Sequence, residues 1–270
     1  MTDATPARAV PYWHVDAFAS RAYTGNQAAV MILDAWPEDA LLQAIGEENN
    51  FAETAFLVPD ATGAADWELR WFTPTVEIRL CGHATLASGH VLLARDPALD
   101  RVTFRTRKAG VLEVRRLGAG YEVALPAIPT EPGGWPEAVA ALGVDPVEVR
   151  RNADNYSLFV LADEAAVHAA SPDFAALAAL GDDSFTITAP GRDTDVVSRV
   201  FVPGAGVNED PVTGSAHAVL TAYWTARLGR DSFSAYQASP RGGHVACRIE
   251  GGRAWLGGDC VTVVEGTFYV

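Results

Sequence analysis

Hydrophobic and polar residues alternate over many short segments of this 270-residue chain, which predicts a protein rich in β-strands. Two longer segments, 83–94 and 216–228, are apolar on nearly every side, and this predicts helices enclosed by other elements. A short helix is predicted at 37–45, with a proline near its first turn. The predicted strands are 13–18, 28–33, 55–58, 67–72, 102–106, 111–115, 121–125, 158–161, 184–188, 196–202, 243–249, 254–256 and 261–264.

This pattern favours an α+β fold made of two similar lobes, with one enclosed helix in each half of the chain. A doubly wound sheet would need regular alternation of strands and helices, and that alternation is missing. The predicted N-terminal lobe is 1–118, completed by a strand at 261–270, and the C-terminal lobe is 119–260. The segment 126–135, rich in Pro and Gly, is the best candidate for a linker.

A repeated pattern supports the two-lobe prediction. Arg70-Trp71-Phe72-Thr73-Pro74 precedes Gly82-His83-Ala84, and Arg199-Val200-Phe201-Val202-Pro203 precedes Gly214-Ser215-Ala216. The offset grows from 129 residues (199 − 70) to 132 (214 − 82), so the second copy has three extra residues. Duplication explains this better than chance, because an apolar helix follows both copies. Two such helix starts can face each other across a cleft and offer unpaired backbone N–H groups to an anion.

Composition narrows the possible partners. A net charge of −14 argues against nucleic acid and against anionic membrane surfaces. An anionic substrate must therefore be held by local groups. Cys81, Cys247 and Cys260 have neither metal-site spacing nor a disulfide framework, so we expect a reducing cytoplasm. We also expect no membrane span and no export signal.

Glu53 is the candidate acid–base residue, because it lies among apolar neighbours in Asn50-Phe51-Ala52-Glu53-Thr54. Desolvation there would raise its pKa toward neutrality, which suits a group that both accepts and donates a proton. The alternative is a solvated acid at the start of a strand. On the residue alone, the solvated acid is the favoured interpretation.

His83 and Ser215 occupy equivalent positions, each directly after a glycine that opens a helix. Backbone N–H groups at such a place could hold a carboxylate or a developing enolate. The alternative is helix capping, which suits Ser215 better than His83. Asp210 could orient a polar substituent of the substrate or bond to His83, or it could simply form an Asp-Pro turn.

Other chemistries fit less well. Cys81 is a rival nucleophile or base, because a helix start favours a thiolate. A metal site from His83, His90, Glu77 and Asp210 does not fit, since the two histidines are seven residues apart. The sequence around Ser215 is not a nucleophile elbow, and no dinucleotide or P-loop pattern occurs. We therefore predict no metal and no cofactor.

Five motifs together resemble the PhzF phenazine-biosynthesis-like proteins, which have the diaminopimelate-epimerase fold. They run in order from about Val15 to the C-terminus, and the last is highly specific. The resemblance implies two β-barrel-like lobes, each wrapped round a central helix, with the site in the cleft between them. The motifs are Tyr23-Thr24-Gly25-Asn26, the segment 50–56, Trp71-Phe72-Thr73-Pro74, the segment 81–87 that begins Cys81-Gly82-His83, and Glu209-Asp210-Pro211-Val212-Thr213-Gly214-Ser215-Ala216.

The resemblance also implies roles for individual residues. Glu53 would be the proton shuttle of a cofactor-independent isomerase similar to trans-2,3-dihydro-3-hydroxyanthranilate isomerase. The implied partners are a small anionic metabolite and, because related proteins form one, a second copy in a homodimer. The implied catalytic residues are Glu53, His83 and Asp210, and the implied substrate-binding residues are Asn26, Gly82, Gly214 and Ser215.

Two alternatives stay open. Racemases and epimerases of this fold carry a cysteine in each half, and Cys81 matches the first of these. The second copy has Thr213 before Gly214, which disfavours a two-thiol enzyme. A non-catalytic protein that binds a small ligand is the other alternative. Gln27 and Arg79 depart from the family pattern, and this puts the substrate in doubt more than the reaction class.

Overall fold

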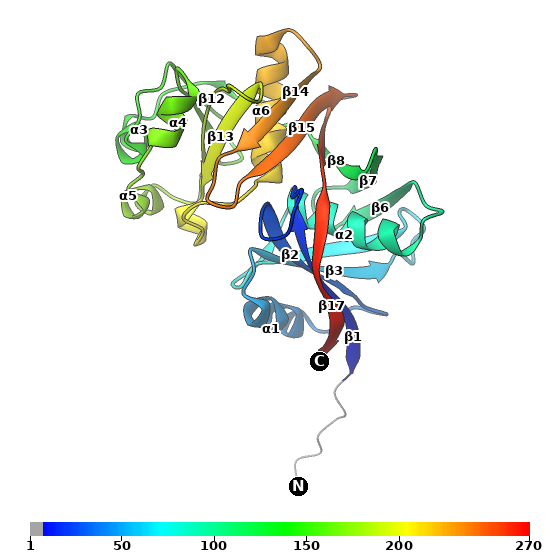
Figure 1. Cartoon of the computed structure of the whole chain (residues 1–270). Coiled ribbons are helices and arrows are strands. Elements are labelled where there is room, and N and C mark those ends of the chain that lie inside the picture. The colour runs from blue at the N-terminus through cyan, green and yellow to red at the C-terminus, as the bar shows by residue number, and fades with distance from the viewer. Residues whose placement is uncertain (1–7) are drawn as a thin grey trace.

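A computed structural model describes residues 8–270, and it consists of two lobes (Figure 1). The helices are α1 Asp39–Asn49, α2 Gly82–Arg95, α3 Pro136–Leu142, α4 Glu164–Ala169, α5 Phe174–Ala179 and α6 Gly214–Leu228, with a 3-10 turn at Pro203–Ala205. The strands are β1 Ala9–Ala17, β2 Asn26–Ile32, β3 Glu53–Pro59, β4 Trp67–Phe72, β5 Glu77–Ile78, β6 Arg101–Thr106, β7 Val111–Leu117, β8 Gly120–Pro126, β9 Glu131–Pro132, β10 Glu148–Arg151, β11 Tyr156–Val160, β12 Ser184–Pro190, β13 Val196–Phe201, β14 Ser232–Gln237, β15 Gly243–Glu250, β16 Arg253–Gly258 and β17 Cys260–Tyr269.

A continuous series of strand pairs links the two lobes. In the first lobe the neighbours run β17, β1, β2, β3, β4, β6, β7 and β8. In the second they run β16, β15, β14, β13, β12, β11, β10 and β9. The antiparallel pair β8–β16 joins the two series, and β17 returns to pair with β1 of the first lobe. The proposed boundary at residues 118 and 119 falls in the turn between β7 and β8.

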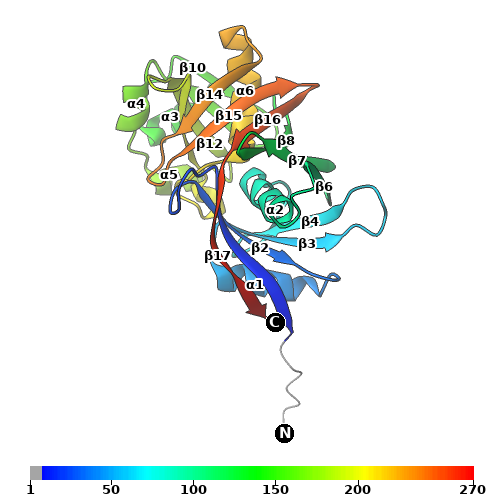
Figure 2. The ribbon, with the colours of Figure 1, turned by 45° about the vertical axis from the view of Figure 1, so that its right-hand side comes forward.

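The strands of each lobe curl round one helix. In the first lobe α2 is enclosed by β1, β2, β3, β6, β7 and β8, as its end-on view in Figure 2 shows. Its residues from Gly82 to Gly89 are all buried, which explains why the segment is apolar on every side. In the second lobe α6 packs on β14, β15 and β16, with a long buried stretch from Ala216 to Thr221. The predicted fold class is confirmed in this architecture.

Three short helices of the second lobe were not predicted. Helices α3, α4 and α5 contain six or seven residues each, too few for the 3.6-residue period to show. They cover the outer face of β11–β13, where Phe159, Phe185 and Ile187 form a core separate from the one around α6. The predicted linker 126–135 is mostly irregular but contains the short strand β9.

The sequence repeat corresponds to one ion pair in each lobe. Arg70 at the end of β4 makes two hydrogen bonds to the carboxylate of Glu77, both 2.8 Å. Arg199 on β13 does the same with Glu209, at 2.8 and 3.0 Å. The sequence separations are 7 (77 − 70) and 10 (209 − 199), so the three extra residues lie between Arg199 and Glu209, beside the 3-10 turn. Each pair ties the strand to the loop that leads into the enclosed helix.

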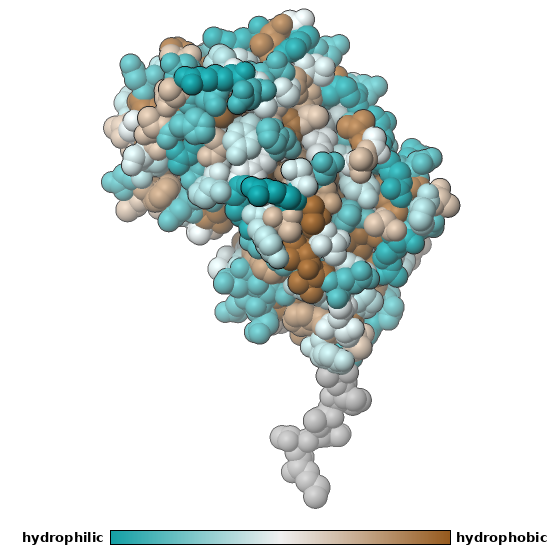
Figure 3. Space-filling view, viewed as in Figure 1, coloured by the Kyte–Doolittle hydropathy of each residue, from teal (hydrophilic) through white to brown (hydrophobic). Residues whose placement is uncertain are grey.

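The surface is mixed in character. Figure 3 shows hydrophilic residues over most of one face, with a smaller apolar patch along β17, where Val264 is 45% exposed. Among the described helices, not one has the length and apolar character that a membrane crossing needs.

Candidate active site

The N-termini of α2 and α6 meet where the lobes touch. A Cβ built on Gly214 would lie 2.6 Å from the Cα of Gly82, and one built on Gly82 would lie 2.8 Å from the Cα of Gly214. Only glycine allows this approach, because any side chain would overlap with backbone. Neither N-cap residue, Cys81 or Thr213, caps its helix through a side chain. The first N–H groups of both helices have no intrahelical partner, so the two positive helix ends present donors at one place.

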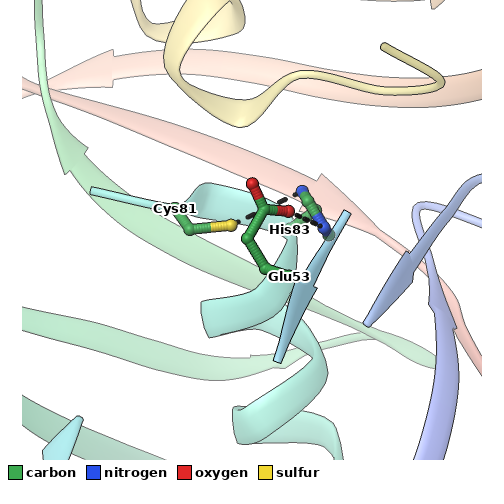
Figure 4. Close-up of side chains that lie close together, drawn as sticks. All are labelled: Glu53, Cys81 and His83. Carbon is green, nitrogen blue, oxygen red and sulfur yellow. Dashed lines mark hydrogen bonds and ion pairs between the residues drawn. The ribbon is translucent and has the colours of Figure 1, made fainter. Parts of the chain in front are cut away.

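Glu53 lies beside these helix ends. It begins β3 through its parallel pairing with β2, where it is opposite Ala28. Its carboxylate Oε2 is 2.9 Å from Nε2 of His83, the second residue of α2 (Figure 4). The side chain of Glu53 is 15% exposed and that of His83 is 4% exposed. The acid is therefore largely shut away from bulk solvent and lies beside the start of α2.

Cys81 completes this group at the other ring nitrogen of His83. Its Sγ is 3.6 Å from Nδ1 of His83, and the thiol is buried. Burial raises the pKa of Cys81 to about 11, with a further contribution from the charge of Glu53. The thiol is consequently protonated at neutral pH, although a helix start alone would favour the thiolate. As a nucleophile or base, Cys81 is weaker than its position in the sequence indicates.

The charge of His83 depends on its neighbours. Burial disfavours the imidazolium, but the charges of Cys81 and Glu53 outweigh burial and raise the pKa of His83 well above its usual value. Because Cys81 is a neutral thiol near pH 7, the carboxylate of Glu53 is the partner that acts there. A protonated His83 places a buried positive charge at the start of α2.

Asp210 reaches the same group from the second lobe through Asn26. The amide nitrogen of Asn26 is 2.8 Å from Oδ1 of Asp210 and 3.1 Å from Nδ1 of His83. Asn26 has no exposed surface, so it orients the two side chains from behind, and direct contact with a substrate stays a prediction. The other oxygen of Asp210 accepts a hydrogen bond from the Thr213 hydroxyl. Burial raises the pKa of Asp210, His83 lowers it and Glu53 raises it again, and the net direction is upward.

Gln237 and Tyr156 belong to the site but were missed in the sequence. Gln237, fully buried at the end of β14, donates to the carbonyl of Asp210 and accepts from the N–H of Thr213 at 2.8 Å, which fixes the loop before α6. Burial raises the pKa of the Tyr156 hydroxyl, and the neighbouring half-buried Ser215 lowers it in part, so Tyr156 lies beside Ser215. The strand β14 was not predicted, and Tyr156 starts a strand with no motif to mark it. No sequence signal pointed to either residue.

Comparison with known proteins is consistent with this geometry. Residues 15–266 match the family model described as phenazine biosynthesis-like protein, PhzC-PhzF. The chain belongs to this family. It is 47% identical over 257 residues to an uncharacterized isomerase of Pseudomonas aeruginosa, covering 94% of this chain and 97% of that one. These relatives confirm the prediction that this PhzF-like chain is an isomerase.

Solved structures support the same assignment. A PhzF family protein of Enterococcus faecalis superposes with a TM-score of 0.89 at 42% identity, covering 97% of this chain and all of that one. A hydroxyproline epimerase of Agrobacterium vitis superposes with a TM-score of 0.62 at 12% identity, covering 97% and 93%. The second likeness shows that the PhzF-like chain shares its fold with epimerases.

Proposed function

We propose that this PhzF-like isomerase moves a proton between two carbons of a small, carboxylate-bearing metabolite, with Glu53 as the single acid–base group and no cofactor. The observation that carries the proposal is the position of Glu53. Its half-buried carboxylate contacts His83 and lies next to the two helix ends at Gly82 and Gly214. A proton acceptor and an anion-binding place are thus adjacent, as a proton shift next to a carboxylate requires.

The proton shift uses one face of the substrate. The Glu53 carboxylate takes a proton from one carbon, and the electron pair of that C–H bond enters the unsaturated system. The resulting carboxylic acid then returns the proton to another carbon on the same face. The composition of the substrate is unchanged, and a double bond has moved.

The neighbouring groups bind the substrate and stabilise its charge. The N–H groups at the starts of α2 and α6, together with the Ser215 hydroxyl, would hold the substrate carboxylate. One donor of this kind contributes roughly 3 kcal/mol to transition-state stabilisation. A protonated His83 would balance the negative charge that develops when the proton leaves. Asp210, engaged through both oxygens with Asn26 and Thr213, would orient a polar substituent of the substrate.

The geometry favours one base over two. Glu53 and Cys81 both come from the first lobe and converge on the same imidazole, so they approach a bound carbon from the same side. Thr213 takes the place of the second cysteine, and a hydroxyl does not replace a thiol as a base. Since the three cysteines are free, we expect the reaction to take place in the cytoplasm. We expect a homodimer because related proteins form one.

The proposal is tested by deuterium uptake from heavy water into a panel of small unsaturated or α-substituted acids. We expect uptake into at least one acid, lost in Glu53→Gln and kept in Cys81→Ala. Uptake that survives in Glu53→Gln and is abolished by alkylation of Cys81 would instead indicate a two-base racemase. Ligands that bind without any uptake would indicate a binding protein.

A further inference from the structure

Three side chains that commonly bind metals converge at one point of the first lobe. A carboxylate oxygen of Glu53, Sγ of Cys81 and a ring nitrogen of His83 all lie within 4.8 Å of one another (Figure 4). The distance from Sγ of Cys81 to Nδ1 of His83 is 3.6 Å. Zn–S and Zn–N bonds of about 2.3 and 2.0 Å at a tetrahedral angle place these two atoms about 3.5 Å apart. The cysteine and the histidine therefore already have the separation that a zinc ion requires.

Two buried atoms of this cluster lack a hydrogen-bond partner among the described residues. Nε2 of His83 and Oε2 of Glu53 are 2.9 Å apart, but they are not aligned as a hydrogen bond. His83 is only 3% exposed, so water does not readily supply a partner. Because buried polar atoms are nearly always paired, the Oε2 atom of Glu53, which faces His83 only across an ion pair, can still take a ligand.

The other nitrogen of His83 is also available. The amide nitrogen of Asn26 has two hydrogens but three acceptors within reach. These are Oδ1 of Asp210 at 2.8 Å, the Val212 carbonyl at 2.9 Å and Nδ1 of His83 at 3.1 Å. The longest contact is the one the amide can give up, because the first two use both hydrogens. His83 can thus bind an ion through Nδ1 while Asn26 stays in place.

We propose that Glu53, Cys81 and His83 form a binding site for a soft divalent cation, best suited to Zn²⁺, with the fourth coordination position open to the cleft. Binding releases the protons that the Cys81 thiol and the His83 imidazolium carry near pH 7. The resulting thiolate and neutral imidazole select zinc over magnesium or calcium, which prefer oxygen ligands. Three protein ligands and one open position are typical of zinc sites that exchange a ligand with solvent. Glu53 faces Nε2 of His83 in the structure, so its side chain must rotate toward Nδ1 to bring an oxygen to bonding distance.

Sequence spacing alone gave no indication of this site. Cys81 and His83 are two residues apart, and Glu53 lies 28 residues earlier on a different strand. Only the enclosure of α2 by β3 brings the three together. Zn²⁺ at this place would occupy the carboxylate of Glu53 and block proton transfer. This consequence, unlike the binding itself, rests on the proposed function.

The test is a titration of metal-free, tag-free protein with Co²⁺ and Zn²⁺. Co²⁺ bound to a cysteine thiolate gives a charge-transfer absorption in the near ultraviolet, which reports the sulfur ligand directly. We expect one equivalent of Co²⁺ to give this absorption, Zn²⁺ to displace it, and Mg²⁺ in excess to leave it unchanged. Cys81→Ala and His83→Gln should abolish it, whereas Cys247→Ala, a change at another buried cysteine, should retain it.

Calorimetry with Zn²⁺ gives an independent result. We expect binding to weaken at least 100-fold in Cys81→Ala and 10-fold or more in Glu53→Gln, with circular dichroism confirming that each variant is folded. Cys81→Ser serves the same purpose should the alanine variant not fold. The proposal is overturned if the wild-type protein gives no thiolate absorption, or if Cys81→Ala and Cys81→Ser bind Zn²⁺ as tightly as it does.

These measurements require no substrate, so they separate the metal site from the isomerase proposal. If Zn²⁺ binds as described and no acid takes up deuterium, the metal site stands and the proposed reaction fails. If an acid takes up deuterium and no metal binds, the proposed reaction stands and the metal site fails.

Discussion

Replacing Gly214 by alanine tests whether the two helix ends must touch. The added Cβ would lie 2.6 Å from the Cα of Gly82, whereas two carbon atoms need about 3.5 Å. The helix ends must therefore separate by about 1 Å. The atoms nearest to the added Cβ belong to the backbone of Gly82, so no flexible side chain can move aside. Overpacking of this kind costs about 1–3 kcal/mol. Since 1 kcal/mol shifts the melting temperature of a large domain by about 2–4 °C, we expect a decrease of about 2–12 °C.

The same displacement should impair catalysis more than stability. A misplacement of about 1 Å in a site that positions a substrate can cost roughly 100-fold in rate. The assays are thermal unfolding and deuterium uptake, with Gly134→Ala as the matched control. Gly134 has no atom within 4 Å of the added Cβ and no positive φ, so that variant should behave as wild type. If Gly214→Ala has the same melting temperature as Gly134→Ala and the same rate of deuterium uptake, the contact between the helix ends does not matter and the reasoning is refuted.

Three further predictions concern stability and reactivity. Burial lowers the pKa of His217 to about 4, so the unfolded chain binds a proton first as pH falls below 6.5. About 3 kcal/mol of stability present above pH 6.5 should be lost by pH 4. In urea unfolding, the free energy of unfolding of His217→Gln should depend less on pH between 6.5 and 4 than that of the wild type. The same pH dependence in both proteins would contradict the prediction. Glu209→Gln should cost about 1–3 kcal/mol of unfolding free energy, because Arg199 is only 14% exposed and Glu209 is its only paired carboxylate in the described part of the chain. Glu77→Gln should lower the free energy of unfolding by less, because Arg70 keeps its ion pair with Asp39. A larger loss in Glu77→Gln than in Glu209→Gln, measured by chemical denaturation, would contradict this prediction. Iodoacetamide should label Cys81 about 100-fold more slowly than a thiol of ordinary pKa, as its own pKa is about 11. Rapid labelling seen by mass spectrometry would mean that the thiol is activated.

The sequence was informative where its periodicity was long or its residues were repeated. Both enclosed helices were predicted to within two residues at either end, because an all-apolar helix of 14 or 15 residues is distinctive. The repeat also revealed the three extra residues before Asp210. Short elements gave no comparable signal: α4 contains only six residues, and the alternation of β14 extends over six residues only.

The site was predictable only in part, for a physical reason. Glu53, His83, Asp210 and Ser215 stand in motifs, and the structure brings the first three into one hydrogen-bonded and ion-paired group through Asn26. The sequence could not show that Asn26 is fully buried behind His83, nor that burial keeps Cys81 protonated. Both depend on how the strands of the first lobe close round α2, and that is decided by contacts far apart in the chain.

The most direct test of the central proposal follows one proton. Once the panel identifies a substrate, it is prepared with deuterium at the carbon that loses its proton, and the reaction is run in ordinary water for a single turnover. A single carboxylic acid shielded from solvent should deliver part of that deuterium to the new carbon, so the product should carry label there. A product with none of the original deuterium, together with an unimpaired Glu53→Gln variant, would contradict the account.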